Sequence, residues 1–179
     1  GLEHGNAKFR ADVVKREYTN ESAIRKIKIV EDLGITFSVN NIIGFPDETR
    51  ELAFDTIELN RQFNSDNTSC SILVPFHGTE LHELCVKKGY LDPNVICAVS
   101  NSGESLLNMP QWSKEDMTRL RDVFAMYIKF PKDRWPEIKR AETDLVLREK
   151  LRQEFVKTYW SDSNAKIEDD IAEAAKGLF

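Results

Sequence analysis

The chain has 179 residues, charged side chains at 31% of its positions and a net charge of -5, and its mean hydropathy is -0.45. These values predict a water-soluble protein of one domain, or of one domain with a helical appendage. They argue against nucleic acid as a partner, since phosphate binding needs a basic face, and against a membrane partner, since no apolar stretch approaches the ~18–20 residues of a membrane span.

Helical and strand patterns alternate in the first half of the chain. Apolar residues recur at helical spacing over 21–33, and a run rich in β-branched residues follows at 35–43. The same order repeats with a helical pattern at 48–63, an apolar run at 68–76 and a helical pattern at 80–88. Such alternation is typical of βα units, whose right-handed crossovers make neighbouring strands parallel. The first strand is apolar at both ends, which favours burial on both faces. The sequence therefore predicts an α/β fold, and an open sheet and part of a barrel both satisfy the pattern.

The second half of the chain has a different character. Residues 93–112 contain proline, glycine, asparagine and serine and are interpreted as an irregular connection. Ser113 then opens a series of helical patterns, with an acidic residue three positions later as in a capping box. The predicted organisation is a βα region over 1–92, a connection over 93–112 and a helical region over 113–179. The later helices are expected at 134–142, 145–159 and 167–175.

A sharp turn is predicted where the first strand ends, in the segment NNIIGFPDET at residues 40–49. Gly44 permits a backbone conformation or a close approach that a Cβ would forbid. Pro46 ends the strand because it lacks an N–H, and Asp47 or Glu48 is suited to capping the next helix. This chemistry is typical of a strand that turns into a helix while its backbone approaches a ligand.

Three segments together resemble one enzyme superfamily. They are GLEHGN at residues 1–6, the turn at residues 40–49 and CSILVPFHGTEL at residues 70–81. In this combination the chain resembles the second half of the barrel of radical S-adenosylmethionine (SAM) enzymes, in particular the branch that carries a cobalamin-binding domain upstream. The resemblance implies the C-terminal part of a partial TIM-type barrel of parallel βα units, followed by an α-helical C-terminal region.

The iron-binding part of that superfamily's pattern is missing. Its 4Fe–4S cluster is held by a Cys-x-x-x-Cys-x-x-Cys motif, whereas Cys70, Cys85 and Cys97 lie 15 and 12 residues apart. These cysteines are expected to be reduced thiols of a cytoplasmic protein. The histidines also lack the spacing of a metal site, so no metal ligand and no catalytic residue is assigned here. The chain is interpreted as a C-terminal fragment. Its cluster ligands, and a cobalamin domain if one is used, would belong to the missing N-terminal part of the same protein.

The resemblance also implies which residues bind SAM. Glu3 takes the position of a polar side chain that faces the ribose or methionyl part, and Arg16 that of an arginine that pairs with the methionyl carboxylate. Asn40 takes the position of a polar contact to SAM, and Ile42 one whose backbone meets the adenine edge. The strand ends are expected on one rim, where ligands bind in such folds. Alternatively, Glu3 only complements a helix dipole and Arg16 is a surface residue.

The intact enzyme implied by the resemblance would bind the 4Fe–4S cluster and SAM and cleave SAM reductively to a 5′-deoxyadenosyl radical. It would use that radical on an unactivated C–H bond of a small-molecule or otherwise unknown substrate. In the cobalamin branch a methyl group often passes to the substrate, and ring-forming members exist. This chain alone is expected to be inactive. The alternative function is a non-catalytic βα and helical docking module, which the loss of every cluster ligand favours.

Overall fold

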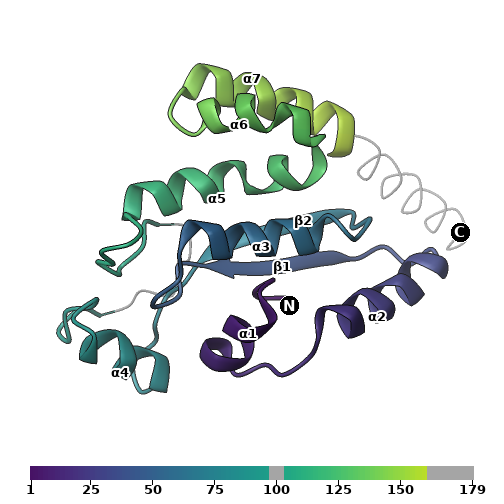
Figure 1. The fold of residues 1–179 in the computed structure, drawn as a ribbon. Helices are drawn as coiled ribbons and strands as arrows, with labels where there is room; N and C mark the ends of the chain where they lie inside the picture. Colours follow the sequence, from purple (N-terminus) through teal and green to yellow (C-terminus); the bar gives the residue numbers. More distant parts are fainter. Residues whose placement is uncertain (97–102, 161–179) are drawn as a thin grey trace, which may run out of the picture.

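The computed structural model describes residues 1–96 and 103–160, and Figure 1 shows its arrangement of a small two-stranded sheet and surrounding helices. The elements in chain order are α1 (Ala7–Phe9), the π-helix η1 (Arg10–Val14), α2 (Asn20–Asp32), β1 (Ser38–Ile43), α3 (Arg50–Asn60), β2 (Asn67–Ile72), α4 (Glu80–Lys87), α5 (Lys114–Lys129), the 3-10 helix η2 (Lys132–Arg134), α6 (Trp135–Ala141), α7 (Leu145–Phe155) and the π-helix η3 (Val156–Trp160). Helices α6 and α7 lie side by side beyond α5, which itself packs on β2.

The strands β1 and β2 pair in parallel, residue for residue, from Ser38 opposite Asn67 to Ile43 opposite Ile72. This pairing confirms the parallel neighbours predicted from the βα alternation. The fold is accordingly mixed α/β, with more helix than strand. Both strands are shorter than predicted. The second ends before Pro75, which has no N–H with which to continue a ladder.

The N-terminal segment lies along the other edge of β1 and pairs with it in parallel at Glu3. Glu3 forms a parallel bridge with Asn41. The Glu3 N–H donates to the Asn40 C=O at 3.2 Å, and the Ile42 N–H donates to the Glu3 C=O at 2.9 Å. Three parallel segments therefore end at one edge of the fold, in the order N-terminal segment, β1, β2.

Hydroxyl and carboxylate side chains mark the beginnings of the longer helices, because each accepts a backbone N–H of the first turn that has no partner within the helix. The cap predicted for α5 at Ser113 is confirmed, since its Oγ accepts from the Asp116 N–H at 3.1 Å. The caps found in this way are Thr19, Thr49, Thr79, Ser113 and Asp144.

The turn after β1 differs from its prediction in one respect. Gly44 adopts a φ of +83°, as its place in the turn led us to expect. Neither Asp47 nor Glu48 caps α3, however, because the next residue, Thr49, does so. Asp47 has a φ of +66° and its carboxylate pairs with Lys88 instead. The prediction failed because three consecutive polar side chains each suit a cap, and only tertiary contacts select one of them.

Helices cover one face of the sheet. Burial alternates along β1, with Val39, Asn41 and Ile43 buried. Ile43 belongs to a core that β1 and β2 share with α3 and α5, so the helical region packs directly on the strands. Representative members of this core are Ile43, Ala53, Ile57, Ile72, Met117, Leu120 and Phe124.

The opposite face of the sheet carries Asn40 and Ile42 from β1, opposite Ser69 and Ser71 from β2. Asn40 and Ser69 are exposed, and Ile42 and Ser71 are half-buried. The prediction that the first strand is buried on both faces is therefore wrong for the part of the chain that the structure describes. This second face is partly polar and accessible, which is what a ligand-binding face requires.

The helices predicted at 134–142 and 145–159 correspond to α6 and to α7 with η3. The helix predicted at 167–175 lies outside the described residues. None of the helices within residues 1–96 and 103–160 has the length and apolar character needed to cross a bilayer.

Candidate functional site

A cavity of ≈ 350 Å³ lies at the edge where the parallel segments end. Glu3 and Arg16 line it from the N-terminal segment, Ile42 lines it from β1, and residues 71–76 line it from the end of β2 and the chain that follows. Three of the four residues that the resemblance implies for SAM thus face a single cavity. Its location agrees with the general rule that ligands bind at the carboxyl ends of parallel strands.

Glu3 and Arg16 form an ion pair across this cavity wall. The distance from Arg16 Nη2 to Glu3 Oε1 is 3.2 Å. The Glu3 side chain is only 14% exposed, whereas that of Arg16 is 50% exposed. The guanidinium therefore neutralises a largely buried carboxylate and keeps half of its own surface accessible.

The backbone at this site is held in an unusual conformation. Glu3 has a φ of +64° and Lys15 a φ of +58°, a region that costs non-glycine residues about 1–3 kcal/mol and is enriched at functional sites. Lys15 ends η1, and the next N–H, that of Arg16, donates to the Arg10 C=O at 3.2 Å. This reversal of the chain brings Arg16 back toward Glu3.

Asn40, the fourth implied residue, does not line the cavity. It lies two residues before Ile42 on the same face of β1, and its Oδ1 accepts a hydrogen bond from the Ser69 hydroxyl at 2.8 Å. The neighbouring Asn41 points into the fold, where its amide donates to Asn60 Oδ1 at 3.2 Å. The two consecutive asparagines thus have separate environments, one accessible and one internal.

Arg10 is a buried residue that sequence reasoning missed. Its guanidinium donates to the His4 C=O at 2.6 Å, to the Asn20 Oδ1 at 3.0 Å and to the Tyr18 C=O. It lies over the Tyr18 ring, 3.9 Å from the centroid. These bonds fix the loop that carries Arg16. Arg10 alternates with Lys8 and Asp12 in the segment AKFRADVV, and nothing in this local pattern distinguishes a buried arginine from an exposed one.

His4 and Glu48 form a second internal polar contact beside the cavity. Both side chains are fully buried, and His4 Nε2 lies 3.2 Å from Glu48 Oε1. Burial raises the pKa of the Glu48 carboxyl above its ordinary value. The His4 ring packs against Phe9 and Phe45, with ring centroids 4.6 and 6.2 Å away.

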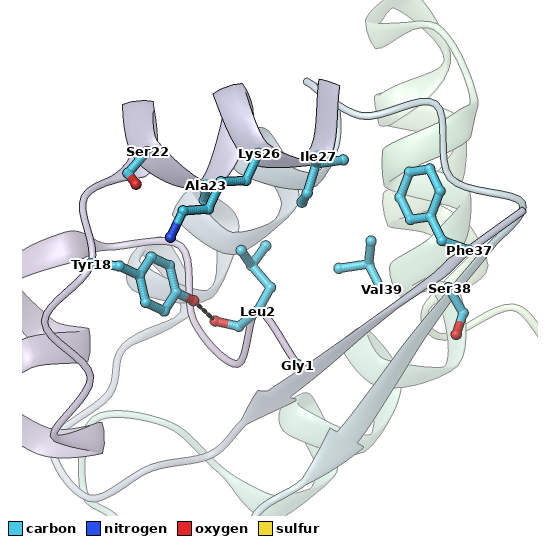
Figure 2. A pocket seen from close by; sticks show the side chains of 10 residues that line it. All are labelled: Gly1, Leu2, Tyr18, Ser22, Ala23, Lys26, Ile27, Phe37, Ser38 and Val39. Carbon is cyan, nitrogen blue, oxygen red and sulfur yellow. Dashed lines mark hydrogen bonds between the residues drawn. The ribbon is translucent and has the colours of Figure 1, made fainter. Parts of the chain in front are cut away.

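A second cavity, of ≈ 370 Å³, lies between α2 and the beginning of β1 (Figure 2). Apolar side chains dominate it, among them Leu2, Ile27 and Val39, and the Tyr18 hydroxyl donates to the Leu2 C=O at its border. It borders the opposite end of β1 from Ile42, and none of the four residues implied for SAM lines it. We therefore take the first cavity as the candidate site.

Among residues 1–96 and 103–160, no three histidine, cysteine, aspartate or glutamate side chains come together as metal ligands. The rings of His77 and His82 are neighbours, with centroids 4.2 Å apart. Cys85 is buried, and Cys70 is half-buried with its thiol pKa raised well above the usual value by burial. Cys97 lies outside the described residues.

Comparison with known proteins gives two distant, partial relatives, and no protein-family model matches the chain. The chain is 29% identical over 91 residues to an uncharacterized methyltransferase of Pyrococcus horikoshii, a match that covers 51% of this chain and 20% of that protein. It is also 29% identical over 77 residues to the anaerobic magnesium-protoporphyrin IX monomethyl ester cyclase of Rubrivivax gelatinosus, covering 43% of this chain and 14% of the cyclase. The matches thus span a fifth or less of each relative, and the chain is a distant relative of a methyltransferase and of a cyclase.

Proposed function

We propose that this chain is the C-terminal part of the barrel of a radical SAM enzyme and that its cavity at the strand ends binds SAM. The observation that carries the proposal is that Glu3, Arg16 and Ile42 line the same cavity. Sequence resemblance assigned these residues to one ligand from three separate positions, and they line one cavity. Surface residues chosen without a shared role would have no reason to converge in this way.

Each residue has chemistry that suits one part of SAM. The Arg16 guanidinium can bind the methionyl carboxylate through two parallel hydrogen bonds, which a lysine cannot reproduce. The Glu3 carboxylate accepts hydrogen bonds from ribose hydroxyls, and Asn40 extends the polar face beyond Ile42. Because the Ile42 N–H is already bonded to Glu3, its carbonyl is the backbone group that would meet the adenine edge. The cavity volume lies within the range of ~300–1,000 Å³ that is usual for small-molecule sites.

The names of the two relatives are compatible with this proposal. A methyltransferase and an anaerobic ring-closing enzyme represent two reaction outcomes that the family resemblance implies. The proposal therefore covers methyl transfer or ring formation on a small molecule, with cobalamin as a further cofactor in the methyl-transferring case. A cytoplasmic location would keep Cys70 and Cys85 as reduced thiols.

The 4Fe–4S cluster does not fit the described residues, since they hold no group of metal ligands. Its ligands would come from the N-terminal part of the same polypeptide. SAM, when reductively cleaved beside such a cluster, supplies the 5′-deoxyadenosyl radical. The residues of this chain contribute binding and orientation of SAM, and they exclude water from part of its surface.

The proposal is tested by anaerobic reconstitution of the full-length protein that contains this chain, with iron and sulfide. We expect one 4Fe–4S cluster per protein, saturable SAM binding by equilibrium dialysis, and release of 5′-deoxyadenosine after addition of dithionite. The same treatment of the 179-residue chain should give neither a stoichiometric cluster nor strong SAM binding. A full-length protein that takes up no cluster and binds no SAM would refute the proposal.

A further inference from the structure

The buried contact between His4 and Glu48 has no direct part in binding at the cavity. Neither side chain lines it, and each is fully buried. A carboxylate held away from water is costly unless its oxygens are hydrogen-bonded, and here burial has raised the Glu48 pKa. Such a group inside a small fold calls for an explanation other than packing.

The hydrogen bonds of this pair define its proton positions. The Asn6 N–H donates to His4 Nδ1 at 3.1 Å, so Nδ1 is unprotonated and the ring proton lies on Nε2. Nε2 therefore donates to Glu48 Oε1. The other carboxylate oxygen, Oε2, accepts from the N–H groups of Gly44 at 2.6 Å and Phe45 at 2.9 Å. Both ring nitrogens and both carboxylate oxygens are thus in use.

These bonds join the two backbone segments that flank the candidate site. His4 directly follows Glu3, whose backbone has the unfavourable φ of +64°. Gly44 follows Ile42 by two residues and turns the chain at the end of β1. The Arg10 guanidinium also holds the His4 C=O at 2.6 Å. The strand end that presents Glu3 already bonds to β1 through the Ile42 N–H. The imidazole–carboxylate contact adds a side-chain link from this strand end to the turn that follows Ile42.

We infer that His4 and Glu48 are positioning residues that hold the turn after Ile42 against the strand end that presents Glu3, at the border of the SAM-binding cavity. The inference rests on the proposed function. It states that two residues outside the cavity measurably increase the affinity of the protein for SAM. Hydrogen-bonded partners that orient metal ligands contribute about 10–100-fold to the affinity or activity of their sites, and we expect an effect of the same order here.

The donor and acceptor pattern provides a specific test. In Glu48→Gln the amide oxygen is required by the two backbone N–H groups, so the NH2 group must face the protonated His4 Nε2. Moving the proton to Nδ1 does not help, because Nδ1 would then face the Asn6 N–H. Adding His4→Gln removes this conflict, since the new side chain can turn its amide oxygen toward the amide at position 48. The Asn6 N–H then loses the acceptor that His4 Nδ1 provided, so the double variant should recover part of what the single variant loses.

A matched control is available in Glu142, which is also buried and accepts from the Tyr127 hydroxyl at 2.7 Å. It pairs with Arg50 and lines neither cavity. Glu142→Gln disturbs a buried carboxylate network of similar size without touching the candidate site. It separates loss of positioning from general loss of stability.

The experiment measures SAM affinity by equilibrium dialysis, iron content and thermal melting in the cluster-loaded full-length protein. We expect Glu48→Gln to weaken SAM binding about tenfold or more with unchanged iron, and His4→Gln/Glu48→Gln to restore a measurable part of that loss. Glu142→Gln should lower the melting temperature and leave SAM affinity unchanged. The inference is overturned if Glu48→Gln binds SAM as the wild type does, if the double variant shows no recovery, or if Glu142→Gln weakens SAM binding equally. A wild-type protein that binds no SAM would overturn the proposed function as well.

Discussion

Arg16 Nη2 lies 3.2 Å from Glu3 Oε1, so the end of the N-terminal strand segment and the end of η1 meet at one point of the cavity rim. The contact joins a largely buried carboxylate to a half-exposed guanidinium. Its two partners are the residues that the family resemblance associates with the ribose or methionyl part of SAM and with its carboxylate.

The first prediction concerns the internal amide pair of Asn41 and Asn60. Asn60 Nδ2 donates to Asn41 Oδ1 at 2.9 Å, and both side chains are buried. Asn41→Ala leaves the Asn60 amide without this partner and should lower the free energy of unfolding by about 1–3 kcal/mol. Urea denaturation measures the change.

The control for that experiment is Asn67→Ala at an exposed position of β2, which should change stability by less than about 0.5 kcal/mol. Replacing both members of the pair, as in Asn41→Val/Asn60→Leu, should cost less than the single alanine variant, since no buried amide is then left unpaired. Equal stability of Asn41→Ala and the wild type would show that this pair is not formed in solution.

The second prediction concerns the Cys70 thiol, whose pKa burial raises well above its usual value. A raised thiol pKa means that less of the reactive thiolate is present at any given pH below it. Alkylation of Cys70 by iodoacetamide at pH 8.5 should therefore be much slower in the native protein than in the urea-unfolded chain. Mass spectrometry of the digested protein assigns the rate to Cys70. Similar rates in both states would contradict the raised pKa of this half-buried thiol.

The third prediction concerns the edge of β1 beside Gly1. Only Glu3 forms a bridge to that edge in the described residues, and the apolar cavity of Figure 2 lies next to it. Open strand edges promote association between chains. The 179-residue chain should therefore self-associate when it is expressed alone, as measured by sedimentation velocity. A lysine placed on this edge, as in Ser38→Lys, should reduce the association. A wild-type chain that is a stable, cooperatively melting monomer would show that the edge is harmless.

The sequence predicted the parallel strands and most helices because their signals are local. Apolar periodicity, β-branched runs and capping hydroxyls all act within a few residues of the element that they specify. The end of β1 at Gly44 was predicted for the same reason. The strand lengths and the choice of Thr49 over Asp47 as a cap were not, since tertiary contacts decide them.

Some residues of the candidate site could also be assigned from local sequence motifs, and others could not. Glu3, Arg16, Asn40 and Ile42 were assigned from a resemblance to linear motifs, and the structure brings three of them to one cavity. The roles of Arg10 and Glu48 depend on contacts across 6 to 44 residues of chain. From its sequence neighbours alone, each side chain would be predicted to be a surface charge or a helix cap. The hydrogen bonds that join it to other parts of the chain are known only from the folded structure.

The most direct test of the account is the SAM affinity of Arg16→Ala in the cluster-loaded full-length protein, with Lys15→Ala as a control that removes the same charge one residue away. We expect Arg16→Ala to weaken SAM binding by about tenfold or more, because a charge-assisted hydrogen bond contributes about 1.5–3 kcal/mol, and to retain all iron. Lys15→Ala should bind SAM as the wild type does. Unchanged SAM affinity in Arg16→Ala, or equal weakening in both variants, would contradict the assignment of this cavity to SAM.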